Sequence, residues 1–245
     1  MRALAFALLT LMALRIGPAT AGFANADQDA AARQVEQGLD LTPNLENGRQ
    51  VYRMCAVCHL PEGWGDESGY YPQIAGQHAS VTIKQMADIR ARNRDVPTML
   101  PFTMVQNLSV QDMADVAAYI ERLPMAPYND LGPGMHLAHG ERLYEEHCAD
   151  CHGAQGEGDA EKNMPLIQGQ HYSYLVRQYR WIKNGKRRNA DKEMTEQAQT
   201  FTGRDISAVM DYTSRLRPPA EKTAQPGWQN GDFADFVRPA LPQTY

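Results

Sequence analysis

The feature that most constrains what this chain can fold into is a five-residue pattern that occurs twice. Residues 55–59 read CAVCH and residues 148–152 read CADCH, and together they contain all 4 cysteines of the chain. A shift of 93 residues also superposes identical residues downstream, among them Gly63 on Gly156, Pro72 on Pro165, Gln77 on Gln170, His78 on His171 and Tyr119 on Tyr212. Self-similarity at a fixed spacing indicates a duplicated domain. The length of 245 residues is enough for two modest cores.

Hydrophobic periodicity within each copy predicts helices and no sheet. The expected helices cover 44–54, 80–91 and a stretch from Ser109 in the first copy, and 137–147, 173–184 and a stretch from Thr202 in the second. Ser80 and Ser173 stand where a capping side chain is expected. Each final helix begins with a hydroxyl residue followed three residues later by Asp, which resembles a capping box. The predicted fold class is all-α.

Four segments lie outside the two copies. Residues 1–21 carry Arg2, an apolar run and a small-residue stop, a pattern typical of a cleaved signal peptide. A membrane anchor is the alternative, but Arg15 interrupts the apolar run, and no later stretch is long enough to span a bilayer. Residues 22–43 form an extension expected to hold a short surface helix. Residues 124–134 are a proline-containing linker, and the aromatic residues of the tail, 218–245, indicate docking across a domain.

The pattern C-x-x-C-H is the attachment signature of c-type haem, because two thiols at this spacing form thioethers and the adjacent His can ligate the iron. A redox dithiol and half of a zinc site are the competing interpretations. The pattern predicts that Cys55 and Cys58, and likewise Cys148 and Cys151, each attach one haem. The proximal iron ligands are then His59 and His152. The net charge of −5 argues against a nucleic-acid partner.

The sixth iron ligand decides between electron transfer and substrate binding, and methionine favours electron transfer. Met194 stands in an otherwise polar segment before the last helix, so we expect it to ligate the second haem. For the first haem, Met99 and Met104 are both candidates. We choose Met99 because flanking prolines restrict the backbone there, so that an extended stretch is expected to hold its side chain against the iron. His78 and His171 are rival ligands, which we expect instead to be polar loop groups near a haem edge or the domain interface.

This combination resembles the dihaem cytochromes c4 and their relatives. The residues that carry the resemblance are the two C-x-x-C-H motifs, the P-x-I-x-G-Q elements at 72–77 and 165–170, and a Met before each final helix. It implies two tandem cytochrome c domains, at 44–123 and 135–217, related by internal duplication. In that family the domains pack through a pseudo-twofold interface that brings the haem propionates close, and electrons pass to terminal oxidases or other periplasmic partners.

We therefore expect a periplasmic carrier of single electrons that performs no bond chemistry and is not an enzyme. Its partners would be a redox donor and acceptor, such as a terminal oxidase or a periplasmic dehydrogenase. An electron-entry subunit of a larger oxidoreductase complex and a dihaem peroxidase-like enzyme are the alternatives. Residues 22–134 hold 14 acids and 8 bases, whereas residues 135–217 hold 12 of each. A basic patch for an acidic partner is expected at Lys183, Lys186, Arg187, Arg188 and Lys192.

Overall fold

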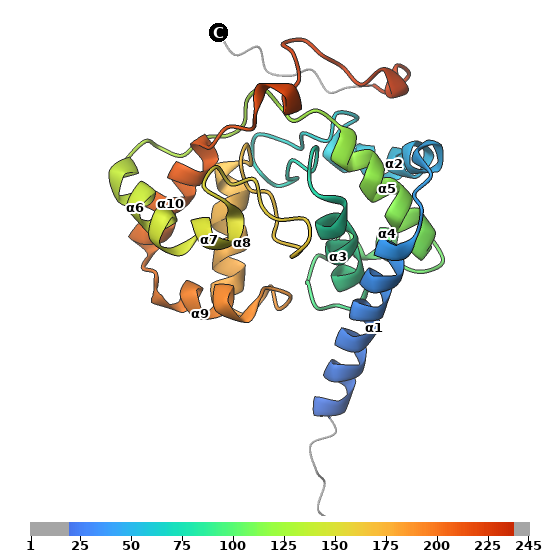
Figure 1. Cartoon of the computed structure of the whole chain (residues 1–245), viewed down its shortest axis with the longest axis horizontal. Helices are drawn as coiled ribbons and strands as arrows, with labels where there is room; N and C mark the ends of the chain where they lie inside the picture. Colours follow the sequence, from blue (N-terminus) through green and yellow to red (C-terminus); the bar gives the residue numbers. More distant parts are fainter. Residues whose placement is uncertain (1–19, 238–245) are drawn as a thin grey trace, which may run out of the picture.

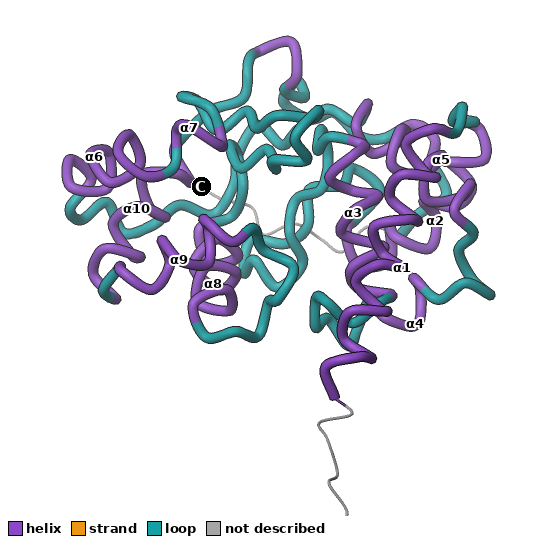
Figure 2. Tube along the Cα trace, turned by 60° about the horizontal axis from the view of Figure 1, so that its bottom comes forward, coloured by secondary structure: helices purple, strands orange, loops and turns teal. Residues whose placement is uncertain are grey.

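The computed structural model describes residues 20–237, which are helical and contain isolated bridges but no strand (Figure 2). The all-α prediction is therefore confirmed over this range. The expected leader, 1–21, lies almost wholly outside the described residues. The helices are α1 (Thr20–Asp40), α2 (Leu45–His59), α3 (Ala79–Arg90), α4 (Leu100–Thr103), α5 (Val110–Arg122), α6 (Leu137–His147), α7 (Ala149–His152), α8 (Tyr172–Lys183), α9 (Lys192–Thr200) and α10 (Gly203–Arg215), followed by the short turns η1 (Ala220–Lys222) and η2 (Gly231–Phe233).

Two lobes lie side by side, α1 to α5 in one and α6 to α10 in the other (Figure 1). In each lobe the helix that leads into C-x-x-C-H crosses the last helix at a glycine. A Cβ at Gly48 of α2 would lie 2.2 Å from the carbonyl oxygen of Asp115 in α5. A Cβ at Gly140 of α6 would lie 2.1 Å from the carbonyl oxygen of Ala208 in α10. Only glycine permits this contact of backbones.

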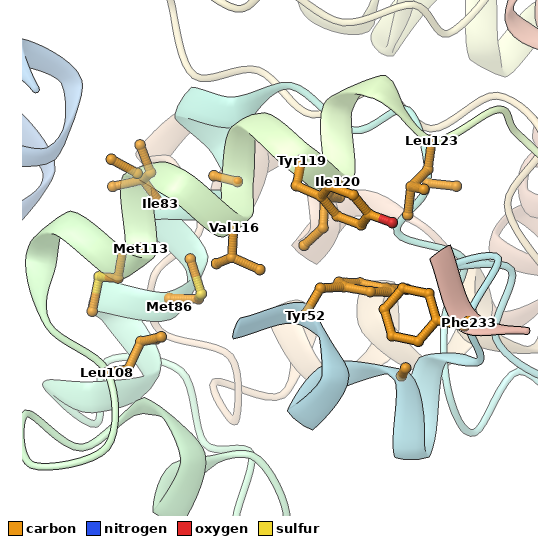
Figure 3. Close-up of a cluster of buried hydrophobic side chains, with 14 residues drawn as sticks. Tyr52, Ile83, Met86, Leu108, Met113, Val116, Tyr119, Ile120, Leu123 and Phe233 are labelled. Carbon is orange, nitrogen blue, oxygen red and sulfur yellow. The ribbon is translucent and has the colours of Figure 1, made fainter. Parts of the chain in front are cut away.

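An aromatic pair next to each crossing fills the core. In the first lobe Tyr52 and Tyr119 have ring centroids 5.2 Å apart, and Figure 3 shows them beside Phe233 of the tail. In the second lobe the pair is Tyr144 and Tyr212, at 5.6 Å. The buried Tyr52 hydroxyl donates to the carbonyl oxygen of Leu60 at 2.8 Å, and that of Tyr144 donates to Gly153 at 2.7 Å. These bonds tie the end of each C-x-x-C-H segment to its core.

The two copies differ by one residue at the start of the motif. Tyr52 and Tyr144 occupy equivalent places but are 92 residues apart, whereas Cys55 and Cys148 are 93 apart. The second copy therefore carries one extra residue between its tyrosine and its first cysteine. Helix α2 runs unbroken to His59, but in the second copy the helix stops at Cys148, with φ −122° and ψ −36°, and resumes as α7. The break accommodates the insertion.

Helix caps follow the expectation at the last helices and not at the middle ones. Both capping boxes are present, at α5 and at α10. The expected Ser caps of α3 and α8 are wrong, because the N-cap positions are His78 and His171. Ser80 Oγ instead donates to the carbonyl oxygen of Ala160, at 2.7 Å. Ser173 donates its backbone N–H and its hydroxyl to the Asp130 carboxylate, so a linker side chain covers the start of α8.

The final glutamine of each P-x-I-x-G-Q element holds the two lobes together. Gln77 accepts from the backbone N–H of Leu166 at 3.0 Å and donates to its carbonyl oxygen at 2.9 Å. Gln170 makes the same two bonds to Gln73, at 3.1 and 2.8 Å. Leu166 and Gln73 are themselves 93 residues apart. The interface is therefore pseudo-twofold in its hydrogen bonds.

Both additions to the repeat lie on the first lobe. Helix α1, with 21 residues, is longer than the short helix expected in 22–43, and it packs against α3 and α5. The tail returns from α10 to the first lobe (Figure 1). Thr223 bridges Met125 of the linker, the Trp228 ring lies 5.9 Å from Trp64, and Phe233 is 1% exposed in the core. The end of the second lobe is thereby fastened to the first.

Candidate functional site

The first site sits at the C-terminal end of α2. Cys55 and Cys58 are three residues apart in the last turns, so their side chains project from one face of the helix. His59 is the last helical residue and is 6% exposed. Leu60 ends the helix in the left-handed region, with φ 64°. Its carbonyl oxygen is the one bonded by Tyr52, so the turn after His59 is held from within the core.

The second site repeats this arrangement across the broken helix. Cys148 caps α7, and Cys151 and His152 are its last residues. Gly153, with φ 82°, replaces Leu60 at the left-handed position, where glycine bears no steric penalty.

Each motif histidine is fixed by the prolyl carbonyl of its own P-x-I-x-G-Q element. His59 Nδ1 lies 3.0 Å from the carbonyl oxygen of Pro72, and His152 Nδ1 lies 3.0 Å from that of Pro165. A carbonyl only accepts, so each Nδ1 carries the proton and each Nε2 keeps a free lone pair. Burial lowers the pKa of both histidines, although the prolyl carbonyls oppose this. Two neutral imidazoles with Nε2 available match what haem iron requires.

The first thiol of each motif does not match a reactive thiol. All four are unpaired in the described chain. A reactive dithiol needs one thiol with a lowered pKa. Burial instead raises the pKa of Cys55 and of Cys148 to about 12 in each case. The spacing, the orientation on one helix face and the adjacent locked histidine fit covalent haem attachment in both lobes.

The methionines lie on short helices that precede α5 and α10. Met194 is the third residue of α9, and it packs against the second core cluster instead of standing without apolar neighbours. Met99 is the N-cap of α4 with helical angles, φ −90° and ψ −23°, where we expected an extended stretch. Met104 follows the same helix. It lies between the buried Thr103 and Leu108, whose carbonyl oxygens both accept from Arg90.

The rival histidines are interface residues. His78 Nε2 donates to the carbonyl oxygen of Glu157, and His171 Nε2 donates to that of Trp64, each at 2.8 Å. Glu157 and Trp64 are 93 residues apart, so these bonds also obey the pseudo-twofold relation. Gln77 and Gln170 stand immediately before these histidines, and sequence reasoning gave them no role. Their recurrence in both copies, without hydrophobic periodicity, is the signal that could have identified them.

The expected basic patch is smaller than the sequence indicated. Lys183 Nζ donates to the carbonyl oxygens of Ala198, Gln199 and Phe201, between 2.8 and 3.0 Å, and so closes the end of α9. Arg187 bonds side chains between the lobes. The exposed bases that remain are Lys186, Arg188 and Lys192.

Within residues 20–237, the helices fall short of the length and apolarity that crossing a membrane requires.

Comparisons with known proteins agree with this geometry. The cytochrome c family model matches residues 45–124 and again 137–216. Cytochrome c4 of Pseudomonas aeruginosa is 31% identical over 217 residues, which cover 85% of this chain and 98% of the relative. A thiosulfate dehydrogenase electron acceptor of Stutzerimonas stutzeri is 31% identical over 198 residues, covering 73% of this chain and 90% of that protein. The crystal structure of reduced recombinant cytochrome c4 from Pseudomonas stutzeri superposes with a TM-score of 0.64 at 26% identity, covering 72% of this chain and 100% of that one.

Two C-x-x-C-H segments, each with its histidine ring held by a prolyl carbonyl, thus stand in two matched domains within one helical fold. Both cysteine pairs fit the covalent haem c that cytochrome c domains bind. The chain belongs to the dihaem cytochrome c4 family, a family of electron-transfer cytochromes.

Proposed function

We propose that this protein is an exported carrier of single electrons that performs no bond chemistry. His59 and Met99 would ligate the first haem iron, and His152 and Met194 the second. Haem iron supplies a one-electron couple, and methionine ligation raises its potential. The chain's own part is to attach, orient and shield the group. The observation that carries the proposal is the pair of identical Nδ1 bonds, 3.0 Å to Pro72 and to Pro165, which present one Nε2 lone pair in each domain.

A hydrogen-bonded interface between the lobes also suits an electron carrier, because electrons can be exchanged without a substrate entering the protein. Side-chain bonds from Gln77, Gln170, His78 and His171 cross the interface at distances between 2.8 and 3.1 Å. An enzyme of the peroxidase kind needs an open or switchable iron position instead. Carbon monoxide binding to the reduced protein tests this directly. We expect none at the native iron sites, and rapid binding together with peroxide turnover would favour the enzyme.

The ligand assignment is tested with Met99→Ala, Met104→Ala and Met194→Ala. In the oxidised protein, Met99→Ala and Met194→Ala should each remove half of the far-red absorption band typical of methionine-ligated haem, and each should lower one reduction potential. Met104→Ala is the matched control, since it removes a thioether from the other end of α4. If Met104→Ala removes half of the band and Met99→Ala leaves it intact, the first ligand is Met104.

We propose that the protein is exported to the periplasm and that its signal peptide is cleaved after Ala21. The mass of the protein purified from cells, with haem included, should correspond to a chain that begins at Gly22. A mass that includes residues 1–21 would contradict the proposal.

A second candidate is the electron-accepting partner of a periplasmic dehydrogenase, alone or as a subunit of its complex. The relative from Stutzerimonas stutzeri, which is named as a thiosulfate dehydrogenase electron acceptor, favours this candidate. Copurification separates the two candidates. A free carrier elutes alone at the mass of this chain, whereas a subunit elutes with a dehydrogenase that reduces it directly.

A further inference from the structure

Aromatic rings gather around one arginine where α8 meets the first lobe. The guanidinium carbon of Arg177 lies 5.2 Å from the ring centroid of Tyr174 and 5.6 Å from that of Trp181. It also lies 5.8 Å from the ring centroid of Tyr70, whose carbonyl oxygen accepts from Arg177 at 3.0 Å. The Lys186 ammonium stands 4.1 Å from the centroid of the Trp181 ring. These five residues, which we call the aromatic surface, come from both lobes.

The first-lobe tyrosine of this surface stands on a loop that is held by its own hydrogen bonds. The Asp66 carboxylate accepts from the backbone N–H groups of Tyr70 and Tyr71, at 3.3 and 2.9 Å. The Tyr71 ring lies 4.9 Å from the Tyr70 ring and 6.3 Å from the His59 ring, between centroids. Tyr70 itself is 57% exposed. The aromatic surface is therefore open to solvent and adjacent to the first attachment site.

The cations of the aromatic surface carry charge that their own chain leaves unneutralised. Among the described residues, no carboxylate lies within ion-pair distance of Arg177, of Lys186 or of the exposed Arg180 one turn further along α8. Aromatic faces attract these cations but do not cancel their charge. Trp, Tyr and Arg are also the residue types that contribute most to binding at protein interfaces. Charge complementarity favours an acidic partner.

The duplication provides an equivalent place on the other lobe, and that place differs in two ways. The repeat equivalents of the five residues include no aromatic ring; they are Asn163, Val81, Lys84, Asp88 and Asn93. Helix α1 also packs there, and its Ala31, Val35 and Leu39 line a cleft of about 500 Å³ together with Lys84 and Asp88. The glutamine and histidine bonds between the lobes are symmetric, so association of the lobes does not require an aromatic stack on one side.

We propose that the aromatic surface is the docking site for an acidic protein that gives or takes one electron. This deepens the proposed carrier function and rests on it. The one electron that the partner loses is gained by one haem iron, or the reverse. Tyr70 and Trp181 supply rigid apolar area, while Arg177 and Lys186 pair with carboxylates of the partner. Because α1 occupies the equivalent side, the partner docks in one place, beside the first attachment site.

The test measures binding of oxidised flavodoxin, an acidic one-electron carrier, to the oxidised, haem-loaded protein by titration calorimetry at low salt. Tyr70→Ala and Trp181→Ala should each raise the Kd about tenfold or more. Lys186→Glu should weaken binding and reduce its dependence on salt. Tyr128→Ala and Arg33→Gln are the matched controls, since Tyr128 is 48% exposed on the linker and Arg33 is an exposed base of α1. Both should stay within about twofold of the natural chain.

Tyr70 and Lys186 are exposed, so their variants remain informative even if Trp181→Ala loosens α8. Haem content and far-ultraviolet circular dichroism are measured on every sample. Absence of flavodoxin binding at low salt, equal losses in Tyr128→Ala and Tyr70→Ala, or equal affinity for the basic mitochondrial cytochrome c would overturn the proposal. Binding that no variant changes in an intact two-haem chain refutes the docking site alone, whereas carbon monoxide binding to the reduced natural chain contradicts the carrier function instead.

Discussion

Replacing Gly48 by Ala tests whether helix contact at a single point holds the first haem-bearing helix in place. A methyl carbon there would lie 2.2 Å from the Asp115 carbonyl oxygen, whereas ordinary contacts begin at 3.4 Å. That oxygen belongs to the backbone of α5, so no rotamer change relieves the clash. The helices must separate by about 1 Å.

The cost follows from what packs around the crossing. Tyr52 and Val116 are both 0% exposed, so a separation of this size opens a gap that nothing fills. A gap of ~0.5–1 Å forfeits roughly a quarter to a half of the dispersion energy of each contact. Overpacking of a core costs about 1–3 kcal/mol. We expect the upper end, about 3 kcal/mol, because the strained partner is backbone.

The assay is guanidinium unfolding of the haem-loaded protein, followed by Soret absorption and far-ultraviolet circular dichroism. Gly203→Ala is the control, since it is also a helical glycine but nothing lies within 4 Å of its added Cβ. It should be neutral or up to about 1 kcal/mol more stable than the natural chain. Gly140→Ala should reproduce the loss in the second domain. If Gly48→Ala unfolds within about 1 kcal/mol of Gly203→Ala, the close crossing is refuted.

Three further outcomes are expected. Lys183→Met should lower the free energy of unfolding by about 2 kcal/mol, because Nζ donates to three carbonyl oxygens at the end of α9; an unchanged unfolding midpoint would contradict this role. Glu121 raises the pKa of His78 above its usual 6.5 in the folded protein. The His78–Glu121 pair therefore stabilises the fold below about pH 6.5, and this stabilisation is lost as the pH rises through the pKa of His78 in the folded protein. Glu121→Gln should therefore be less stable than the natural chain at about pH 5.5 but not at about pH 8.5, and an equal difference at both would exclude the linkage. The rate of electron transfer from an acidic partner should fall with added salt and in the Lys186→Glu variant. Rates insensitive to both changes would refute docking through the basic surface.

Local chemistry made much of this structure predictable. The helix expected at 137–147 has the bounds of α6, and the boxes begun by Ser109 and Thr202 are both formed. Such signals depend on residues within one turn of each other. The attachment motif was equally accessible, because its thiols and imidazole lie on one short segment.

What the sequence could not provide depends on distant partners. The start of α8 is covered by Asp130, 43 residues away, and not by the serine that propensity favoured. Gln77 and Gln170 take their roles from an interface 89 and 97 residues away in the chain. Which methionine would ligate the first haem depends on how α4 folds, and the repeat gives no register there, since position 194 aligns with Pro101.

Because the tail packs on the first lobe, it affects when that lobe can finish folding. Phe233 belongs to the core that contains Tyr52, and Arg53 pairs with Asp235 across 182 residues. A chain delivered from its N-terminus exposes CAVCH early, but Asp235, which pairs with Arg53 next to that motif, follows only 182 residues later. The first domain therefore cannot complete its core before Phe233 of the tail has been delivered. Contacts this remote in sequence form slowly, which leaves the first motif a longer interval as an open segment in which its haem can be attached.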